Sequence, residues 1–415
     1  MTRTHLLKKR ISILMASIAF LVLVMALPMV AWSQETTETL PQTKRISILI
    51  CSPSTDVVYN RFGHAAIRLM DEDAGSDIIY NYGTFDNTIP NFEIRFMRGE
   101  TDYYVEALPS AYYLNEFIQN GRGVTELVLN LSQEEISRAQ TYLNRNIQPE
   151  NRQYRYNFLY DNCATRLISI VKEATGGTLQ IPDKGEERTW RELINGCCTD
   201  APWVQLGIDM VIGSKADASA TTEEQFFLPG RILDMLPHTT LLRPDGSASP
   251  LVMDTIELFS PLPFSTEPSE EGWPTPLAAS IVLLALTIGI VVMDIHRRKI
   301  CRLYDSIVMG IAGLSGCIIF AMAFFSVHPH TSPNYILFLL HPLHLLIGLP
   351  LTAIPRLRQA GFVYHFINFA ELSLIGLVIW FLPQQVVMPL YVAGIAMWLL
   401  SARWILINKW RKNVR

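Results

Sequence analysis

The chain has 415 residues, of which 49% are hydrophobic and 17% are charged, and its formal net charge at pH 7 is -4. This length allows two or more domains, the apolar content favours insertion into a membrane, and the weakly acidic balance gives no support for binding to nucleic acid. Most charged residues lie before Glu271 and the long apolar segments follow it, so the sequence predicts an exported soluble half and a membrane-embedded half.

The first 33 residues have the pattern of a secretory signal peptide. Basic residues between Arg3 and Arg10 precede an apolar stretch, which is followed by Pro28 and the small residues Ala31 and Ser33. We expect cleavage after Ser33, and an uncleaved anchor is the alternative because the apolar stretch is longer than usual. In either case the basic flank stays in the cytoplasm and the residues that follow are exported.

The first part of the exported half has the pattern of β-structure. Residues 45–52, RISILICS, form an apolar run bounded by turn residues, which predicts a buried strand. Residues 62–70 and 77–82 lie on either side of an acidic turn that contains glycine, which predicts a hairpin. The acidic turn is more typical of an exposed loop than of a metal site.

One histidine of this hairpin is a candidate for catalysis. Alternation along the strand puts His64 on the face opposite the aliphatic row that begins with Ala65. If Met70 pairs with Asp77, Asn81 becomes a diagonal neighbour of His64 on the same face. A slip of the register by one residue would separate the two side chains.

The run YRYNFLYDNCATRL, residues 154–167, has the pattern of a helix start with a cysteine in its first turn. The positive end of the helix dipole and the unpaired N–H groups there favour thiolate over thiol, so Cys163 is a candidate nucleophile. The structural alternative is a small buried side chain, since free cysteines are among the most buried residues. Asp161 and Arg166, which flank the cysteine, are candidates for its support.

Together these residues have the chemistry of a thiol catalyst. His64 is expected to take the proton of Cys163 and return it to a leaving group, while Asn81 or a nearby acid orients the imidazole. Backbone N–H groups around Cys163, with help from Asn162, are expected to hold the developing oxyanion.

No rival nucleophile has comparable support. The sequence has no G-x-S-x-G elbow, no phosphate-binding glycine loop and no Cys or His pairs with zinc-ligand spacing, so we expect neither a metal nor a cofactor. The redox state of Cys51, Cys197 and Cys198 stays open, because their spacing permits a disulfide from Cys51 without requiring it.

Five apolar segments follow, each about as long as a helix needs to cross roughly 30 Å of hydrocarbon. They are residues 276–295, 306–325, 335–354, 363–382 and 387–405. Lysine and arginine follow the first, third and fifth segments and are missing from the loops SVHPHTSPN and PQQ. The positive-inside rule therefore predicts that the soluble half is outside and the C-terminus is cytoplasmic.

The two halves are joined by a stretch rich in Pro, Ser, Thr and Gly. Before it, Leu206 and Met210 fit one face of a helix and are expected to pack the soluble half toward the membrane. The predicted order is a signal peptide (1–33), a periplasmic catalytic domain (34–265), a linker (266–275), a transmembrane domain (276–405) and a basic cytoplasmic tail (406–415).

Polar side chains inside the apolar segments are functional candidates, because hydrocarbon penalises them unless they are paired or face a wet cavity. His344 and Glu371, on the third and fourth segments, are predicted to lie at the same depth, with His341 nearer the outer surface. The three residues form a candidate substrate site within the membrane. The alternative is that they only tie helices together.

Several long motifs resemble one family. They are NRFGHAAIRL, YNYGTFDNTIPNFEIRFMRGETDYY, YNFLYDNCATR, GIDMVIGSKADASATTEEQFFLP and HPHTSPN. With the five apolar segments, they make nearly the whole mature chain similar to the Lnb family of lipoprotein N-acyltransferases. The resemblance implies an α+β domain like the permuted NlpC/P60 (papain-like) and lecithin:retinol acyltransferase-like thiol enzymes, with an antiparallel sheet and a helix that carries the cysteine. An all-α bundle of five transmembrane helices is expected to follow.

Carried over by position, the family's histidine falls on His64 and its cysteine on Cys163, in the order of a permuted domain. Asn81 is preferred as the third catalytic residue over Asp77 and Asp86. The implied reaction is a ping-pong transfer: Cys163 takes an acyl chain from a phospholipid as a thioester and passes it to the α-amine of the diacylglyceryl-cysteine of an apolipoprotein. The implied location is the bacterial inner membrane, which the chain crosses several times, with the catalytic domain in the periplasm.

Two other classes of function stay open at this stage. A cell-wall amidase or peptidase similar to NlpC/P60 enzymes would have a polar, open cleft and no need for membrane spans. A non-catalytic membrane receptor or assembly factor would only pack Cys163 in its interior. The acyltransferase is preferred because two bilayer-anchored substrates explain the fusion of a soluble catalytic unit to membrane spans.

Overall fold

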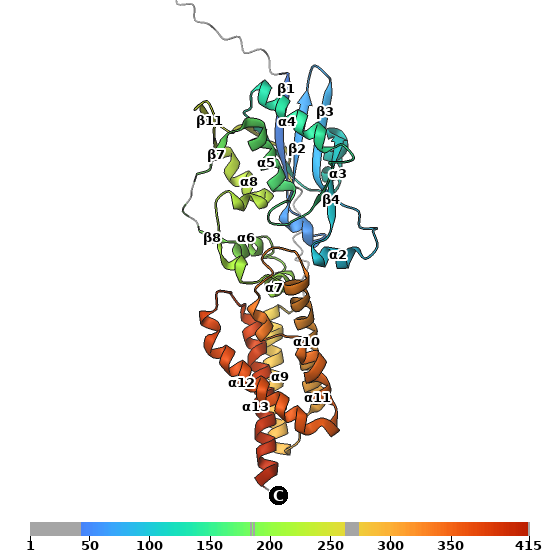
Figure 1. Ribbon diagram of the computed structural model, residues 1–415, viewed down its shortest axis with the longest axis vertical. Helices are drawn as coiled ribbons and strands as arrows, with labels where there is room; N and C mark the ends of the chain where they lie inside the picture. Colours follow the sequence, from blue (N-terminus) through green and yellow to red (C-terminus); the bar gives the residue numbers. More distant parts are fainter. Residues whose placement is uncertain (1–42, 183–184, 186, 262–273, 414–415) are drawn as a thin grey trace, which may run out of the picture. The chain divides into compact units, whose positions relative to one another are not determined.

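The computed structural model describes residues 43–182, 185, 187–261 and 274–413. The predicted signal peptide and residues 266–273 of the predicted linker lie outside this range. Within it, a region that mixes helices and strands is followed by a helical region (Figure 1). The predicted α+β class of the soluble half, with its antiparallel sheet, is confirmed.

The first region is built on a sheet of seven strands among the described residues. These strands are β1 (Lys44–Cys51), β2 (His64–Asp71), β3 (Ser76–Thr84), β4 (Asp102–Pro109), β5 (Val124–Leu129), β6 (Gln153–Arg155) and β12 (Val252–Phe259). They pair antiparallel in the order β12-β5-β1-β2-β3-β4-β6, so β1 and β2 lie near the centre. The shorter strands are β7 (Thr178–Gln180), β8 (Arg188–Thr189), β9 (Ser219–Ala220), β10 (Thr240–Leu242) and β11 (Ala248–Pro250).

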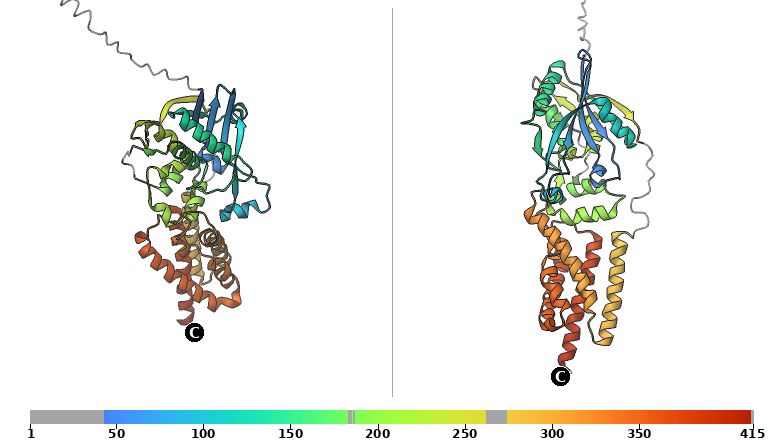
Figure 2. Two further views of the ribbon diagram at one scale, coloured as in Figure 1. Left: turned by 45° about the horizontal axis from the view of Figure 1, so that its top comes forward. Right: turned by 90° about the vertical axis from the view of Figure 1, so that its right-hand side faces the viewer.

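Helices cover both faces of the large sheet (Figure 2). Ile67 of β2 belongs to the core that the sheet forms with α4 (Gln133–Asn146) and α5 (Cys163–Thr175). Its neighbour Ala66 belongs to the core on the other face, beneath α3 (Ser110–Gln119). The predicted alternation along this strand is therefore correct. The remaining helices and turns are η1 (Val58–Phe62), α2 (Phe92–Arg98), α6 (Trp190–Gly196), α7 (Pro202–Val211), η2 (Ser214–Asp217), η3 (Glu224–Phe227), α8 (Pro229–Met235) and η4 (Leu236–His238).

The hairpin of β2 and β3 has the predicted register, with Met70 opposite Asp77. Its first strand is shorter than predicted, because Phe62 belongs to the turn η1 and Gly63 follows it with a φ of 73°. A Cβ at Gly63 would lie 3.1 Å from a backbone carbonyl oxygen of β1, so glycine is required for both reasons. As a consequence the strand begins at His64.

Four of the described helices are long and apolar enough to cross a membrane, and they match four of the five predicted segments. They are α9 (Pro276–Arg297), α10 (Arg302–Phe325), α12 (Arg358–Val378), which continues through η7 (Pro355–Leu357) before it and η8 (Ile379–Phe381) after it, and α13 (Met388–Asn413). α13 packs against both α9 and α12.

The predicted all-α membrane half is confirmed, although its third predicted segment, residues 335–354, is not one continuous helix. It consists of the 3-10 turn η5 (Tyr335–Phe338), the π turn η6 (His344–Gly348) and α11 (Leu349–Ala353). Pro342 and Pro350 have no N–H to donate, which interrupts a regular helix. Its backbone packs closely on α10, where a Cβ at Gly316 would lie 2.5 Å from the carbonyl carbon of His341. Irregular backbone is tolerated at membrane depth when protein covers it.

The loop between α10 and η5 joins the two regions. The N–H of Gly213, just after α7, donates to the carbonyl oxygen of His330 at 2.6 Å. The amide of Asn334 donates to the carbonyl oxygen of Met210 at 2.9 Å. Leu206 and Met210 also pack against the hydrophobic cluster of the membrane helices, as predicted from the sequence.

Candidate active site

Cys163 is the first residue of α5, so it lies at the helix start that the sequence predicts. Oδ1 of Asn162 accepts the N–H groups of Ala164 and Thr165, each at 2.9 Å. In return, the N–H of Asn162 donates to the hydroxyl of Thr165 at 2.9 Å. This capping box fixes the first turn and holds the sulfur near the positive end of the helix dipole.

The fold brings Cys163 of α5 and His64 of β2 together, and each side chain shifts the pKa of the other. Nε2 of His64 lies 2.7 Å from Oδ1 of Asn81, so the other ring nitrogen, Nδ1, is the one that faces the sulfur. A Cβ at Gly83 would lie 3.1 Å from Cε1 of His64 and 3.9 Å from Cβ of Cys163. Because its φ is also 131°, this position requires glycine.

Asn81 is oriented by two residues that the sequence analysis missed. Its amide donates to the hydroxyl of Thr84 at 3.1 Å, and that hydroxyl donates to Oε2 of Glu106 at 2.9 Å. Since a carboxylate only accepts, the hydroxyl of Thr84 must accept from the nitrogen of Asn81, which turns Oδ1 toward His64. Nε2 of His64 therefore carries a proton. Glu106 lies directly opposite Asn81 in the pairing of β3 with β4.

The contact shifts the pKa values of both catalytic candidates. Burial raises the pKa of Cys163, but the charge and hydrogen bond of His64 and the N–H groups of Ala65 and Ala164 lower it below the ordinary thiol value. Burial lowers the pKa of His64, but the charge and hydrogen bond of Cys163 and the hydrogen bond of Asn81 raise it above the ordinary value. Both shifts favour a thiolate beside an imidazolium, which is the reactive form of a catalytic cysteine.

The other candidates for the third residue are engaged elsewhere. Asp77 pairs with Arg68, whose Nη2 lies 2.6 Å from its Oδ2. Asp86 accepts the N–H of Thr88 at 2.8 Å. Of the three carboxylate or amide side chains considered, Asn81 is the one that contacts His64.

The residues predicted to support the site lie around the helix start. Arg166 pairs with Asp161, with its Nε 2.6 Å from Oδ1. Asn162 does not fit the expected role of oxyanion donor, because its amide donates to the carbonyl oxygens of Phe158 and Phe227, each at 2.8 Å. With both amide hydrogens engaged, its side chain positions the turn before Cys163.

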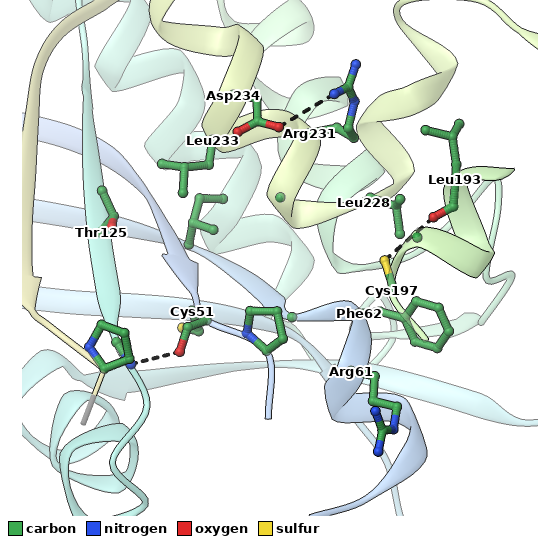
Figure 3. A pocket seen from close by; sticks show the side chains of 18 of the residues that line it. Cys51, Arg61, Phe62, Thr125, Leu193, Cys197, Leu228, Arg231, Leu233 and Asp234 are labelled. Carbon is green, nitrogen blue, oxygen red and sulfur yellow. Dashed lines mark hydrogen bonds and ion pairs between the residues drawn. The ribbon is translucent and has the colours of Figure 1, made fainter. Parts of the chain in front are cut away.

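A cavity of about 440 Å³ lies among β1, α6 and α8, and its lining does not include Cys163 (Figure 3). Two free thiols line it, Cys51 and Cys197. Burial is the main reason why the pKa of Cys51 is raised to about 12 and that of Cys197 to about 11. Both thiols are therefore poor nucleophiles at neutral pH, in contrast to Cys163. All cysteines in the described ranges are free, so no disulfide involves Cys51 or Cys197.

The three polar candidates of the membrane half lie together. Nε2 of His341 is 3.5 Å from Oε2 of Glu371, and the rings of His341 and His344 stack with centres 3.7 Å apart. Both nitrogens of His344 are engaged, with the hydroxyl of Tyr364 at 2.6 Å and the carbonyl oxygen of Leu339 at 3.1 Å. These contacts tie η6 to α12, whereas the side chain of Glu371 stays one-third exposed.

No group of three or more His, Cys, Asp or Glu side chains within the described ranges is arranged to hold a metal ion. The side chains that the site brings together are a thiol, an imidazole and an amide that orients the ring.

Comparison with known proteins identifies both halves of the chain. Residues 32–196 match the Lnb N-terminal periplasmic domain, and residues 268–412 match the Lnb transmembrane domain. No curated protein and no solved structure matches the chain. The two matched domains follow one another in the order of the α+β region and the helical region. The chain therefore belongs to the Lnb family of membrane lipoprotein N-acyltransferases, with a periplasmic domain ahead of its transmembrane domain.

Proposed function

We propose that this protein moves an acyl chain from a membrane phospholipid to the α-amine of the diacylglyceryl-cysteine of apolipoproteins, by way of a thioester on Cys163. The observation that carries the proposal is the meeting of Cys163, His64 and Asn81 in a periplasmic domain that is joined to membrane helices. A thioester is a suitable intermediate because an amine opens it readily at neutral pH.

In the first step the thiolate of Cys163 attacks the carbonyl carbon of a phospholipid ester. The negative charge that develops on the carbonyl oxygen needs hydrogen-bond donors. Since Asn162 caps the N–H groups of Ala164 and Thr165, the N–H of Cys163 itself is the backbone donor that we assign to the oxyanion. The C–O bond of the ester then breaks, and His64 gives its proton to the departing oxygen, which releases a lysophospholipid.

In the second step the α-amine of the apolipoprotein attacks the thioester carbonyl. His64, now neutral, takes a proton from the attacking nitrogen, and the C–S bond breaks to return the thiolate of Cys163. The product is an amide, and the imidazolium and thiolate are restored. Asn81 keeps the imidazole in the orientation that both steps require.

The membrane half is assigned a supporting part in this scheme. Both substrates are anchored in the bilayer. Helices that keep the thiol at the membrane surface therefore raise the effective concentration of the thiol near these substrates, compared with a catalytic domain free in solution. Of the polar cluster in the membrane, His341 and Glu371 are the residues that we assign to contact with lipid, because His344 has both ring nitrogens engaged within the protein.

The domain limits and topology are part of the same proposal. We assign residues 1–33 to a signal peptide, 34–265 to the periplasm, 266–275 to a linker, 276–405 to the inner membrane and 406–415 to a cytoplasmic tail. The distribution of lysine and arginine supports this orientation. So does the match of the N-terminal part to a periplasmic domain.

Replacement of the nucleophile tests the proposal. Cys163→Ala is expected to abolish N-acylation of lipoproteins, measured by mass spectrometry of their N-terminal peptides, while the protein still inserts into the membrane. Cys197→Ala is the matched control, because this thiol has a raised pKa and lies outside the catalytic series. In the wild type, an acyl group on Cys163 that hydroxylamine releases would support the thioester. Retention of N-acylation by Cys163→Ala would refute it.

A further inference from the structure

The short helix α2 carries four large apolar side chains among its seven residues, yet none of its residues is buried. Ile94 is 58% exposed, Phe96 44% and Met97 40%. By helical spacing, Phe92 and Phe96 share one side of α2, and Ile94 and Met97 lie on the other. Large apolar side chains that are exposed together on one element mark a surface that contacts a membrane or another molecule. The described part of the chain does not bury these side chains. Contact with an apolar environment outside the protein would remove them from water, which is favourable.

Two hydrogen bonds hold α2 at one end of the membrane helix α10. The N–H of Val327 donates to the carbonyl oxygen of Arg98 at 2.9 Å. Nε2 of His328 donates to the carbonyl oxygen of Phe96 at 2.6 Å. Both donors come directly after α10, in the loop that joins the membrane helices to the soluble region. α2 therefore lies level with the end of a helix long and apolar enough to cross a membrane, where interfacial helices contact lipid.

A continuous row of aromatic rings leads from this helix into the soluble domain. The steps between ring centres are His328 to Phe96 (6.0 Å), Phe96 to Phe92 (6.2 Å), Phe92 to Phe85 (5.6 Å), Phe85 to Tyr103 (5.0 Å) and Tyr103 to Tyr156 (4.2 Å). Each step is within the range of direct ring contact. The row thus begins at the membrane loop and ends in the interior of the catalytic domain.

The inner end of the row lies against α5, the helix that carries the nucleophile. The ring centre of Tyr154 is 6.4 Å from that of Tyr103, and the guanidinium of Arg166, three residues after Cys163, lies 3.7 Å from the ring centre of Tyr154. Tyr156 and Cys163 pack against the same hydrophobic core, beside the buried Tyr103 and Tyr154. Burial chiefly, and next the negative charge of Cys163, raise the pKa values of Tyr154 and Tyr156. This dependence on the charge of the sulfur agrees with their position near it.

We propose that α2 inserts into the outer leaflet and that the aromatic row guides the acyl chain of the donor phospholipid from the bilayer to Cys163. The inference rests on the proposed function and adds the route that its lipid substrate takes. An acyl chain that leaves the bilayer loses apolar contacts, and a row of rings replaces those contacts while the ester moves toward the sulfur. Tyr103 and Tyr156 then border the chain next to the reacting carbonyl.

The test compares a lipid donor with a water-soluble donor. The full-length protein, its Ile94→Asp and Phe96→Ser variants and the control Ile118→Asp are reconstituted in phosphatidylethanolamine vesicles. Ile118 is a suitable control because it is 46% exposed on α3, away from the row. Acylation of Cys163 is measured by mass spectrometry of the intact protein, from the vesicle lipid in one arm and from p-nitrophenyl acetate in the other.

We expect Ile94→Asp and Phe96→Ser to slow acylation from the phospholipid by about tenfold or more. Acylation from p-nitrophenyl acetate is expected to stay at the wild-type rate, which also shows that the site is folded, and Ile118→Asp should match the wild type with both donors. Equal rates from phospholipid in the wild type and both α2 variants would overturn the lipid route and leave the thioester mechanism standing. If no acyl group forms on wild-type Cys163 with either donor, the proposed function fails, and the route fails with it.

Discussion

His64 in the soluble half and His365 in the membrane half each lie between two polar side chains, but their surroundings differ. His64 contacts the thiol of Cys163 and the amide of Asn81, and it is only partly buried. His365 is fully buried, with Nε2 3.1 Å from the hydroxyl of Thr352 and Nδ1 3.1 Å from the hydroxyl of Ser401. The imidazole of His64 therefore contacts a reactive thiol, whereas the imidazole of His365 is enclosed by neutral hydroxyl groups.

The charged residues of the membrane half show the same closure. Arg403 is fully buried between Asp294, at 2.7 Å from its Nη1, and Asp305, which also accepts the indole N–H of Trp404 at 2.7 Å. These contacts join α9, α10 and α13. The comparison teaches that a titratable side chain becomes a functional candidate through its partners and its access, because the same residue types serve as ties between helices when they are fully enclosed.

The largest difference between the two regions should appear when each histidine is removed. His64→Ala is expected to lower the rate of N-acylation by about 10²–10⁴-fold, because the thiol loses its general base and the leaving group its acid. His365→Ala should leave the rate per folded molecule close to that of the wild type. The measurement is acyl transfer to a diacylglyceryl peptide, normalised to the amount of folded protein. Equal losses in the two variants would contradict the division between reactive and structural histidines.

Removal of the buried charge of Arg403 should have the opposite pattern of effects to His64→Ala: a large loss of stability and a small change in the rate of N-acylation. Arg403→Met leaves Asp294 and Asp305 without their buried partner, which is expected to lower the free energy of unfolding by roughly 3–5 kcal/mol. Thermal unfolding in detergent measures the change. Arg356→Met is the control, because Arg356 is exposed at the same end of the membrane helices. A melting temperature of Arg403→Met equal to that of the control would show that the cluster does not hold the helices together.

The sequence predicts the pairing of His64 with Asn81 and the helix start at Cys163, because these two features are local. His64 and Asn81 come from adjacent strands of one hairpin, and the assumed pairing of Met70 with Asp77 is sufficient to bring them together. The helix start at Cys163 follows from its capping residues. Both features can be predicted without similarity to a solved structure.

The rest of the site depends on contacts between distant segments, which no local pattern contains. Glu106 is opposite Asn81 only because β4 pairs with β3, and the sequence gives no register for that pair. The expected oxyanion role of Asn162 failed for a similar reason, since one of the carbonyl groups that its amide contacts is that of Phe227. The break in the third membrane segment has a local signal in Pro342 and Pro350, which the prediction from the length of the apolar run does not use.

Loss of the amide next to His64 should have an intermediate effect and should change the pH profile of the thiol. The hydrogen bond to Asn81 raises the pKa of His64, so Asn81→Ala lowers that pKa and weakens the charge that keeps the pKa of Cys163 low. Alkylation of Cys163 by iodoacetamide is therefore expected to rise with pH at a higher midpoint than in the wild type. N-acylation should fall by about tenfold or more. An unchanged midpoint would rule out electrostatic control of the thiol through Asn81.

The smallest effect is expected at Thr84, which touches neither the sulfur nor the imidazole and acts only through Asn81. Thr84→Val keeps the shape of the side chain but removes the hydroxyl, which accepts from the amide of Asn81 and donates to Glu106. The loss of one hydrogen bond, about 1 kcal/mol, corresponds to roughly a fivefold lower rate of N-acylation. Thr84→Ser should restore the rate, because it returns the hydroxyl. A positioning role also predicts that Thr84→Val shifts the alkylation midpoint of Cys163 upward, in the same direction as Asn81→Ala but less far. If the rate falls and the midpoint stays at the wild-type value, Thr84 contributes to the packing of β3 and not to the orientation of His64.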